Sequence, residues 1–173
     1  MKEKIKIVQE DITKLDVDAI VNAANNSLLG GGGVDGAIHR VAGPGLLEET
    51  RNIGGCPTGE ARVSRGYNLK ARWVIHTVGP VWKGGGQNEE KFLANCYRNS
   101  LAAAVEKGAK TVAFPAISAG VYGFPLRRAT EIAMRETIQF LENNGCLDQI
   151  IFVCFSKKAM KTYEETFSAI FTA

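Results

Sequence analysis

The sequence has little of what metal centres and disulfide scaffolds require. It contains only four cysteines and two histidines among its 173 residues. The cysteines, at positions 56, 96, 146 and 154, are widely spaced and form no Cys-x-x-Cys pair. Many structural zinc sites use such pairs, so we expect no metal site. Two of the cysteines fall in apolar stretches, and we expect all four to be reduced and to behave as small hydrophobic side chains.

Strong charge and long apolar runs are absent as well. The net charge is only +3, whereas nucleic-acid binding normally needs basic residues clustered on one face. Nucleic acid is therefore not an expected partner. No apolar run approaches the roughly 20 residues that span a bilayer, and no hydrophobic signal segment follows Met1. We therefore expect a cytoplasmic protein that does not associate with a membrane.

The composition is that of an ordinary globular domain. Hydrophobic residues make up 45% of the chain and charged residues 23%, which argues against disordered and fibrous structure. A chain of 173 residues suits one hydrophobic core. Because no linker or repeat divides it, we expect residues 1–173 to form a single domain.

Short β-rich runs alternate with amphipathic helical stretches. Residues 150–155 are apolar throughout, which is typical of a strand covered on both faces. Helices are expected from near Val34, from Asn88 to Gly108, from Pro125 to Gly145 and from Lys157, judging by the Pro and Gly at their ends. The pattern predicts a three-layer α/β/α domain. The expected strands are residues 5–9, 19–24, 61–65, 73–78, 111–115 and 150–155. The order of these strands is not readable from the sequence.

Four consecutive glycines, residues 30–33, precede the first of these helices. Such a run costs conformational entropy, which a fold tolerates where the backbone needs a positive φ or approaches a ligand closely. The free N–H groups and dipole of a helix N-terminus favour an anion, and phosphate is the obvious candidate. A flexible hinge is the alternative.

Two familiar phosphate-binding motifs do not account for this loop. Residues 31–36 match Gly-x-Gly-x-x-Gly, but a run of glycines satisfies that pattern easily, and residues 25–29 separate it from the preceding strand. The P-loop Lys followed by Ser or Thr is missing. A classical dehydrogenase or nucleotide triphosphatase is therefore disfavoured.

A second loop rich in small residues, 116–125, also follows an apolar strand and precedes a helix. Ligands of open α/β sheets bind at the carboxyl ends of the strands. Two such loops can enclose one phosphate chain from both sides.

Several spaced motifs together resemble the macrodomain family, in its MacroD-type branch. They are Glu-Asp-Ile-Thr at 10–13, Asn-Ala-Ala-Asn at 22–25, residues 30–39, Gly-Pro-Val-Trp at 79–82 and residues 115–123. The resemblance extends from Ile5 to about Phe167. It implies a mixed, mostly parallel six-stranded sheet between helices, with a deep cleft for ADP-ribose. It also implies hydrolysis of O-acetyl-ADP-ribose, and of mono-ADP-ribose esters on acidic side chains of proteins, without a cofactor.

Two further functions stay open beside hydrolysis. A macrodomain can bind ADP-ribose as a reader without turning it over. A role in RNA metabolism rests on analogy alone, since the sequence has no stripe of basic and aromatic residues.

The resemblance also assigns residues to the ligand. Asp11 would accept a hydrogen bond from the adenine amino group, although an Asp here also suits capping of the next turn. Phe155, at the end of the last expected strand, would stack on adenine; burial in the core is the alternative. Tyr122 would pack over the distal ribose. The remaining substrate-binding residues, mostly through backbone amides to the two phosphates, are Ile12, Gly31, Gly32, Gly33, Val34, Ser118, Ala119, Gly120 and Val121.

The expected catalytic residues are Asn25, Asp35 and His39. Asn25 would hold the distal ribose, or would serve only as a turn residue. Asp35 would act as general base for water, with a pKa raised by a nearby pyrophosphate; complementing the helix dipole is the alternative. His39 lies one helical turn later on the same face, where it orders Asp35 or water, or has a structural role.

Two features are left outside the predicted site. His76 lies in the middle of an expected strand, and we interpret it as a core residue. Residues 83–87, Lys-Gly-Gly-Gly-Gln, form either a closing lid or a flexible turn.

Overall fold

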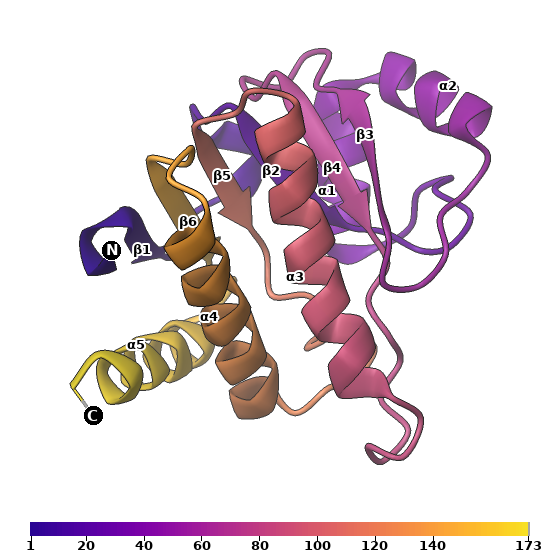
Figure 1. Ribbon diagram of the computed structural model, residues 1–173. Coiled ribbons are helices and arrows are strands. Elements are labelled where there is room, and N and C mark those ends of the chain that lie inside the picture. Colours follow the sequence, from indigo (N-terminus) through magenta and orange to yellow (C-terminus); the bar gives the residue numbers. More distant parts are fainter. Residues whose placement is uncertain (173) are drawn as a thin grey trace.

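A six-stranded sheet lies between two layers of helices in the computed structural model, which describes residues 1–172 (Figure 1). The sheet order is β1-β6-β5-β2-β4-β3, and every neighbouring pair is parallel except the antiparallel pair β3–β4. The strands are β1 (Ile5–Val8), β2 (Ala19–Ala23), β3 (Ala61–Arg65), β4 (Trp73–Thr77), β5 (Thr111–Phe114) and β6 (Gln149–Val153). The predicted α/β/α fold with a mixed, mostly parallel sheet is therefore confirmed.

All six expected strands exist, but five of them end earlier than the apolar runs indicate. Each of those runs continues one or two residues into the loop that follows. Core contacts still cover the loop residues Ala24, Val78 and Pro115, whereas Gln9 and Phe155 are exposed. Ala24 illustrates this, since its N–H donates to the Thr77 carbonyl at 2.9 Å although β2 has already ended at Ala23. Phe155 is affected most: it lies two residues beyond the end of β6 and belongs to the loop.

Five α-helices cover the sheet. On one face, α3 (Glu89–Glu106), α4 (Leu126–Asn143) and α5 (Lys157–Thr172) pack on strand residues that include Val21, Phe114 and Phe152. On the other face, α1 (Gly33–Ala42) and α2 (Pro44–Ile53) pack on Ile20 and Val74. Figure 1 shows α3 and α4 in front of the sheet and α1 behind it. The apolar strands are thus buried on both sides, as their sequences predict.

The predicted face of α3 is buried as expected, with all five residues at 0% exposure: Leu93, Cys96, Tyr97, Leu101 and Ala104. Gly108, with a φ of 76°, follows the end of this helix. Within residues 1–172 no disulfide links the cysteines, and Cys56, Cys96 and Cys154 are buried.

Helix α2 was missed by the sequence analysis. Its signals were present, because Pro44 occupies the first turn and Gly54 ends the helix in the left-handed region with a φ of 84°. Gly45 makes the segment look like a turn. The structure explains that glycine, since a Cβ there would lie 2.7 Å from the Tyr67 ring.

In the part of the chain that the structure describes, no helix combines the length and the apolar character needed to cross a bilayer. Nor do three or more His, Cys, Asp or Glu side chains among residues 1–172 gather in a way that could hold a metal ion.

Candidate functional site

The carboxyl ends of four adjacent parallel strands bring the predicted site residues to one edge of the sheet. Asp11 follows β1, Phe155 follows β6, residues 118–122 follow β5, and Asn25 with the glycine loop follows β2. Because the strand order is β1-β6-β5-β2, these segments emerge as a row. Three interstrand spacings of about 4.8 Å make this row about 14 Å long. The strand order therefore places Asp11 and Phe155 at one end of the row, residues 118–122 in its middle, and Asn25 with the glycine loop at its other end.

Asp11 caps the short 3-10 turn Ile12–Lys14 at one end of this row. Its Oδ1 accepts from the Thr13 N–H at 3.0 Å and from the Thr13 hydroxyl at 2.7 Å. Those two bonds lower the pKa of Asp11. The capping alternative is thus realised, and the exposed carboxylate still has Oδ2 for a ligand. Ile12 is 5% exposed, so its side chain belongs to the core beneath α1.

Phe155 is exposed almost entirely. Its exposed fraction is 99%, and that of Val121 in the β5 loop is 103%. The core alternative for Phe155 is therefore wrong. Leaving a large apolar side chain in water forgoes about 1.5–3 kcal/mol of burial. Both side chains stand at the edge of the sheet where the row of predicted residues lies.

The first glycine loop reaches helix α1 without a side-chain cap. Gly32 is the N-cap residue, so the first N–H groups of the helix are left for a ligand or water. Position 33 favours glycine, because its φ of 58° lies in the left-handed region that side chains disfavour. A Cβ on Gly36 would lie 2.6 Å from the Gly31 carbonyl oxygen, so only glycine lets the loop approach the helix this closely. Val34 is half-buried in the first turn.

Asn25 shapes this loop. Its Nδ2 donates to the Gly30 carbonyl at 2.9 Å, and its Oδ1 accepts from the Ser27 hydroxyl at 2.7 Å and from the Leu28 N–H at 3.1 Å. The turn role of Asn25 is therefore real. Asn25 and the catalytic candidate Asp35 both border Gly31, because a Cβ there would lie 3.3 Å from Asn25 Nδ2 and 3.2 Å from Asp35 Oδ2.

Asp35 is a buried carboxylate, 4% exposed, in the first turn of α1. Its Oδ1 accepts from Asn22 Nδ2 at 2.9 Å and lies 3.4 Å from His39 Nε2. Burial raises the pKa of Asp35, and the Asn22 hydrogen bond and His39 only partly oppose this. The expected rise in pKa thus has its cause in the fold and needs no pyrophosphate. His39 lies beside Asp35 as the helical spacing predicts.

The second loop is wedged against the segment that follows β4. A Cβ on Gly79 would lie 2.1 Å from Ser118 Oγ, and Trp82 N–H donates to the Tyr122 carbonyl at 2.8 Å. Ser118 has a φ of 64°, and its buried hydroxyl has no hydrogen-bond partner among the described residues. Ala119 and Tyr122 are half-buried, while Gly120 is exposed. The loop therefore presents backbone at the edge of the sheet on a rigid base.

Residues 83–87 are exposed and are held by hydrogen bonds to Glu89. Its carboxylate accepts from the N–H groups of Lys83 at 2.8 Å, Gly85 at 2.9 Å and Gln87 at 2.5 Å. Burial raises the pKa of Glu89, but the backbone N–H donors outweigh it and lower the pKa to about 2. Sequence reasoning missed this clasp. Asn88 is the N-cap as predicted, but no side-chain capping bond from it occurs within the described residues.

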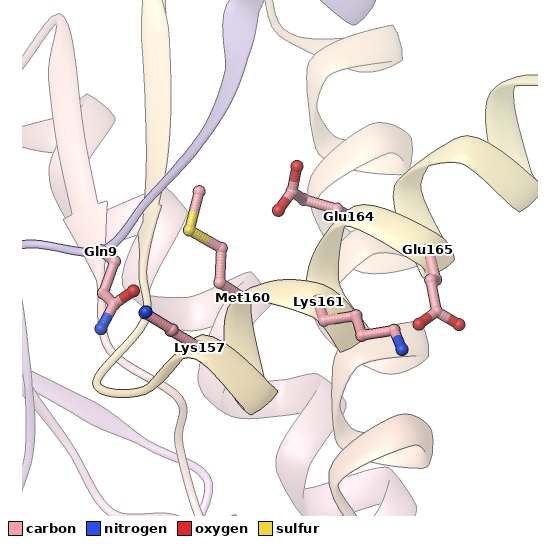
Figure 2. A pocket seen from close by; sticks show the side chains of 6 residues that line it. All are labelled: Gln9, Lys157, Met160, Lys161, Glu164 and Glu165. Carbon is pink, nitrogen blue, oxygen red and sulfur yellow. The ribbon is translucent and has the colours of Figure 1, made fainter.

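A surface hollow of about 360 Å³ borders the end of the row where Asp11 and Phe155 lie (Figure 2). It is lined by Gln9, Lys157, Met160, Lys161, Glu164 and Glu165. None of these was a predicted site residue, although Gln9 and Lys157 are each two residues from Asp11 and Phe155. A second hollow, of about 440 Å³, lies around residues 65–73 at the opposite edge of the sheet. The two glycine loops themselves form an open surface, since Gly31, Gly32, Gly33 and Gly120 are exposed.

Comparison with known proteins places this geometry in a family. The sequence profile described as "Macro domain" matches residues 21–133. A "Macro domain-containing protein" of Methanosarcina mazei is 54% identical, with 97% of this chain and 90% of that protein covered. The "O-acetyl-ADP-ribose deacetylase" of Escherichia coli is 51% identical over 95% of each chain.

Solved structures agree with the sequence matches. A mutant of the Oceanobacillus iheyensis macrodomain with ADPR superposes with a TM-score of 0.92 at 44% identity, covering 96% of this chain and 93% of that one. The Trypanosoma brucei macrodomain in complex with ADP-ribose gives a TM-score of 0.89 at 50% identity, covering 94% and 68%. With a matching family profile over more than half its length, the chain belongs to the macrodomain family.

Proposed function

We propose that this protein binds ADP-ribose along the carboxyl edge of the sheet and hydrolyses the acetyl ester of O-acetyl-ADP-ribose. The observation that carries the proposal is the pairing of Asp35 with the glycine loop. A buried carboxylate with a raised pKa lies at the uncapped N-terminus of α1, and its Oδ2 and Asn25 Nδ2 both border the point where a side chain on Gly31 would begin. The names of relatives such as the Escherichia coli deacetylase support the same reaction.

Binding follows from the order of the strands. Adenine stacks on Phe155, which contributes about 1–3 kcal/mol in comparable base-stacking sites, and its amino group donates to Asp11. The diphosphate lies between the glycine loop and residues 118–122, where backbone N–H groups and the α1 dipole compensate its charge. Asn25 holds the distal ribose and Tyr122 packs over it. Contacts far from the reacting ester thereby position it.

Hydrolysis then needs one water and one base. Asp35 Oδ2 takes a proton from the water while the water oxygen attacks the acetyl carbonyl carbon. The tetrahedral intermediate collapses with cleavage of the bond between the acyl carbon and the ribose oxygen, and Asp35 passes the proton it took from the water to that oxygen. ADP-ribose and acetate leave. A carboxylate with a raised pKa is a better base at neutral pH than an exposed one.

The same geometry fits a second ester. Mono-ADP-ribose attached to an Asp or Glu side chain is also an ester of the distal ribose, so the attacking water meets the same kind of carbonyl. We include removal of ADP-ribose from acidic side chains of proteins in the proposal for that reason. The exposed loops leave room for a macromolecular acyl group.

Acetate release from O-acetyl-ADP-ribose tests the reaction, and calorimetry with ADP-ribose tests binding. We expect release by the wild type and a loss of about 10²–10⁴-fold in kcat for Asp35→Ala, the usual contribution of a general base. Asp148→Ala is the matched control, because Asp148 is exposed and precedes β6 at the opposite edge of the sheet. Equal rates for the wild type and Asp35→Ala would rule out Asp35 as the base.

Binding without turnover is the second candidate. It is favoured by the engagement of both polar atoms of Asn25 in the loop's own turn. In that case the wild type binds ADP-ribose, but neither it nor Asp35→Ala releases acetate. Absence of any binding heat with correctly folded protein would reject both candidates.

A further inference from the structure

A line of buried polar side chains runs behind Asp35, across three strands. Asn22 on β2 and His76 on β4 are 0% exposed, and Ser64 on β3 is 1% exposed. Asn22 Nδ2 lies 2.9 Å from Asp35 Oδ1 and 3.1 Å from His76 Nδ1, and Ser64 Oγ lies 2.8 Å from His76 Nε2. The line therefore connects Asp35 to the antiparallel edge strand of the sheet.

With Asp35 ionised, each hydrogen in this line has one consistent position, in which Asn22 Oδ1 is buried without a hydrogen-bond partner among the described residues. An amide nitrogen only donates, so the two hydrogens of Asn22 Nδ2 go to Asp35 Oδ1 and to His76 Nδ1. His76 Nδ1 must then accept, and the ring proton must be on Nε2, from which it is donated to Ser64 Oγ. The Ser64 hydroxyl in turn donates to the Arg65 carbonyl at 3.2 Å.

The state of His76 agrees with this assignment. Burial, with a smaller effect of His39, lowers the pKa of His76 to about 3. The ring is therefore neutral at physiological pH and has one acceptor and one donor. Rotating the Asn22 amide by half a turn would put its oxygen against the Asp35 carboxylate, which two acceptors do not tolerate.

One consequence concerns the two oxygens of Asp35. Asn22 and His39 both approach Oδ1. Oδ2 is the oxygen near Gly31 and Asn25, on the side of the glycine loop. The buried line thus anchors one oxygen and leaves the other for the water.

We propose that His76 and Ser64 are positioning residues for the hydrolysis: by fixing the Nε2–H tautomer, they keep the Asn22 amide as a donor to Asp35 Oδ1 and present Oδ2 to the substrate. The inference rests on the proposed function. Both residues are buried, and their hydrogen bonds reach Asp35 through Asn22.

Ser64→Ala removes the acceptor of the His76 Nε2–H. The tautomer of His76 protonated on Nδ1 then competes. Its Nδ1–H and the Asn22 Nδ2–H would be two donors facing each other, so the Asn22 amide rotates. The rotation brings the amide oxygen toward Asp35 Oδ1. We expect kcat for O-acetyl-ADP-ribose to fall about tenfold, the size of one hydrogen bond, with KM and ADP-ribose affinity within about twofold of wild type. Ser64→Thr keeps a hydroxyl and is expected to restore kcat. Ser100→Ala is the matched control, because Ser100 is equally buried and has no hydrogen-bond partner among residues 1–172.

The pH profile separates positioning from a loss of structure. The Asn22 hydrogen bond lowers the pKa of Asp35, so the acidic limb of kcat should move to higher pH in Ser64→Ala and stay in place in Ser64→Thr. The titratable groups that face Asp35 are His39 on its own helix and His76 beyond Asn22. Repeating the pH profile with His39→Gln added to Ser64→Ala and to Ser64→Thr removes the contribution of His39 to the acidic limb of kcat.

Nitrogen NMR of the wild type tests the tautomer without any reaction. We expect a protonated Nε2 and an unprotonated Nδ1 on His76, unchanged from pH 8 to about pH 5. A protonated Nδ1 overturns the inference, as does Ser64→Ala with wild-type kcat and limb, or an equal loss in Ser64→Ala and Ser64→Thr. Failure of the proposed function has a different signature, since the wild type itself would then release no acetate.

Discussion

At the residue scale, the chemistry of the site depends on how close Asp35, Asn25 and Gly31 lie to one another. Any side chain at Gly31 would enter the space between Asp35 Oδ2 and Asn25 Nδ2. Gly36 permits this arrangement, because its lack of a side chain lets the Gly31 carbonyl lie against helix α1. A carboxylate that is buried in this way loses solvation. The burial that makes Asp35 a good base therefore also lowers the stability of the folded protein.

Replacing Asp35 with asparagine should therefore separate stability from activity. Burial raises the pKa of Asp35 in the folded state, so the folded protein binds this proton more readily than the unfolded chain. Stability from this group is consequently gained as the pH falls through the raised pKa, and at higher pH the ionised carboxylate is destabilising. We expect Asp35→Asn to have a higher Tm than the wild type at pH 8, with kcat lower by about 10²–10⁴-fold.

Thermal unfolding from pH 4 to pH 8 measures this effect. The Tm advantage of Asp35→Asn should shrink toward low pH, where the wild-type carboxyl is protonated. Asp148→Asn serves as control and should follow the wild type throughout. A variant less stable than the wild type at pH 8 contradicts the prediction.

At the element scale, a single carboxylate at the start of α3 organises the segment that leads into it. Glu89 binds three N–H groups of the preceding turn, and Trp82 at the start of that turn binds the Tyr122 carbonyl. The N-terminus of α3 is therefore linked through this turn to the second loop, residues 116–125. In the sequence this region shows only three glycines and a predicted N-cap at Asn88.

Glu89→Gln tests this link. A neutral amide is a weaker acceptor than a carboxylate, so amide hydrogen exchange of Lys83, Gly85 and Gln87 should accelerate about tenfold or more. Glu90→Gln is the matched control, because Glu90 pairs with Arg128 at the surface, where such a pair contributes little. Unchanged exchange in Glu89→Gln would mean that the segment is held by other contacts.

The Glu89 carboxylate also makes the stability of the wild type depend on pH in the acidic range. The folded-state pKa of Glu89 is lowered to about 2 from an ordinary value of 4.5. Its contribution to stability is therefore complete above about pH 4.5 and is lost as the pH falls toward 2. The exchange rates of the three amides in the wild type should rise within that interval.

Local patterns in the sequence predicted most elements but not their ends. The apolar run at residues 150–155 predicted β6, yet periodicity gives no sign that Phe155 has left the strand and stands in water. Helix α2 escaped notice because a glycine inside it, Gly45, is required by contact with Tyr67, which is distant in sequence. In both cases tertiary contacts, which no local window contains, decide the outcome.

At the scale of the whole molecule, strand order turns scattered motifs into one site. Asp11 and Phe155 are far apart in the sequence and become neighbours because β1 pairs with β6. The nature of the candidate residues was predictable, since glycine loops and a helix-borne Asp are visible in the sequence. The line from Asn22 through His76 to Ser64 was not predictable, because it crosses strands whose pairing the sequence leaves open.

Phe155→Ala tests the proposed direction of the ligand along the edge. Loss of one base-stacking contact of about 1–3 kcal/mol should weaken binding of ADP and of ADP-ribose by the same factor, roughly 5- to 150-fold. Binding of ribose 5-phosphate, which lacks adenine, should not change. Tm should also stay unchanged, because the side chain is 99% exposed. Calorimetry with the three ligands gives the comparison, and an equal loss for ribose 5-phosphate would reverse the proposed orientation.

Phe155 and Val121 have a last consequence for the protein without its ligand. Both apolar side chains are in full contact with water, so this edge of the sheet exposes apolar surface. A nucleotide lying across Phe155 and Val121 would cover their exposed apolar surface. The ligand would then complete the fold at the place where the chain alone leaves it open, and the saturated protein would be less prone to self-association than the empty one.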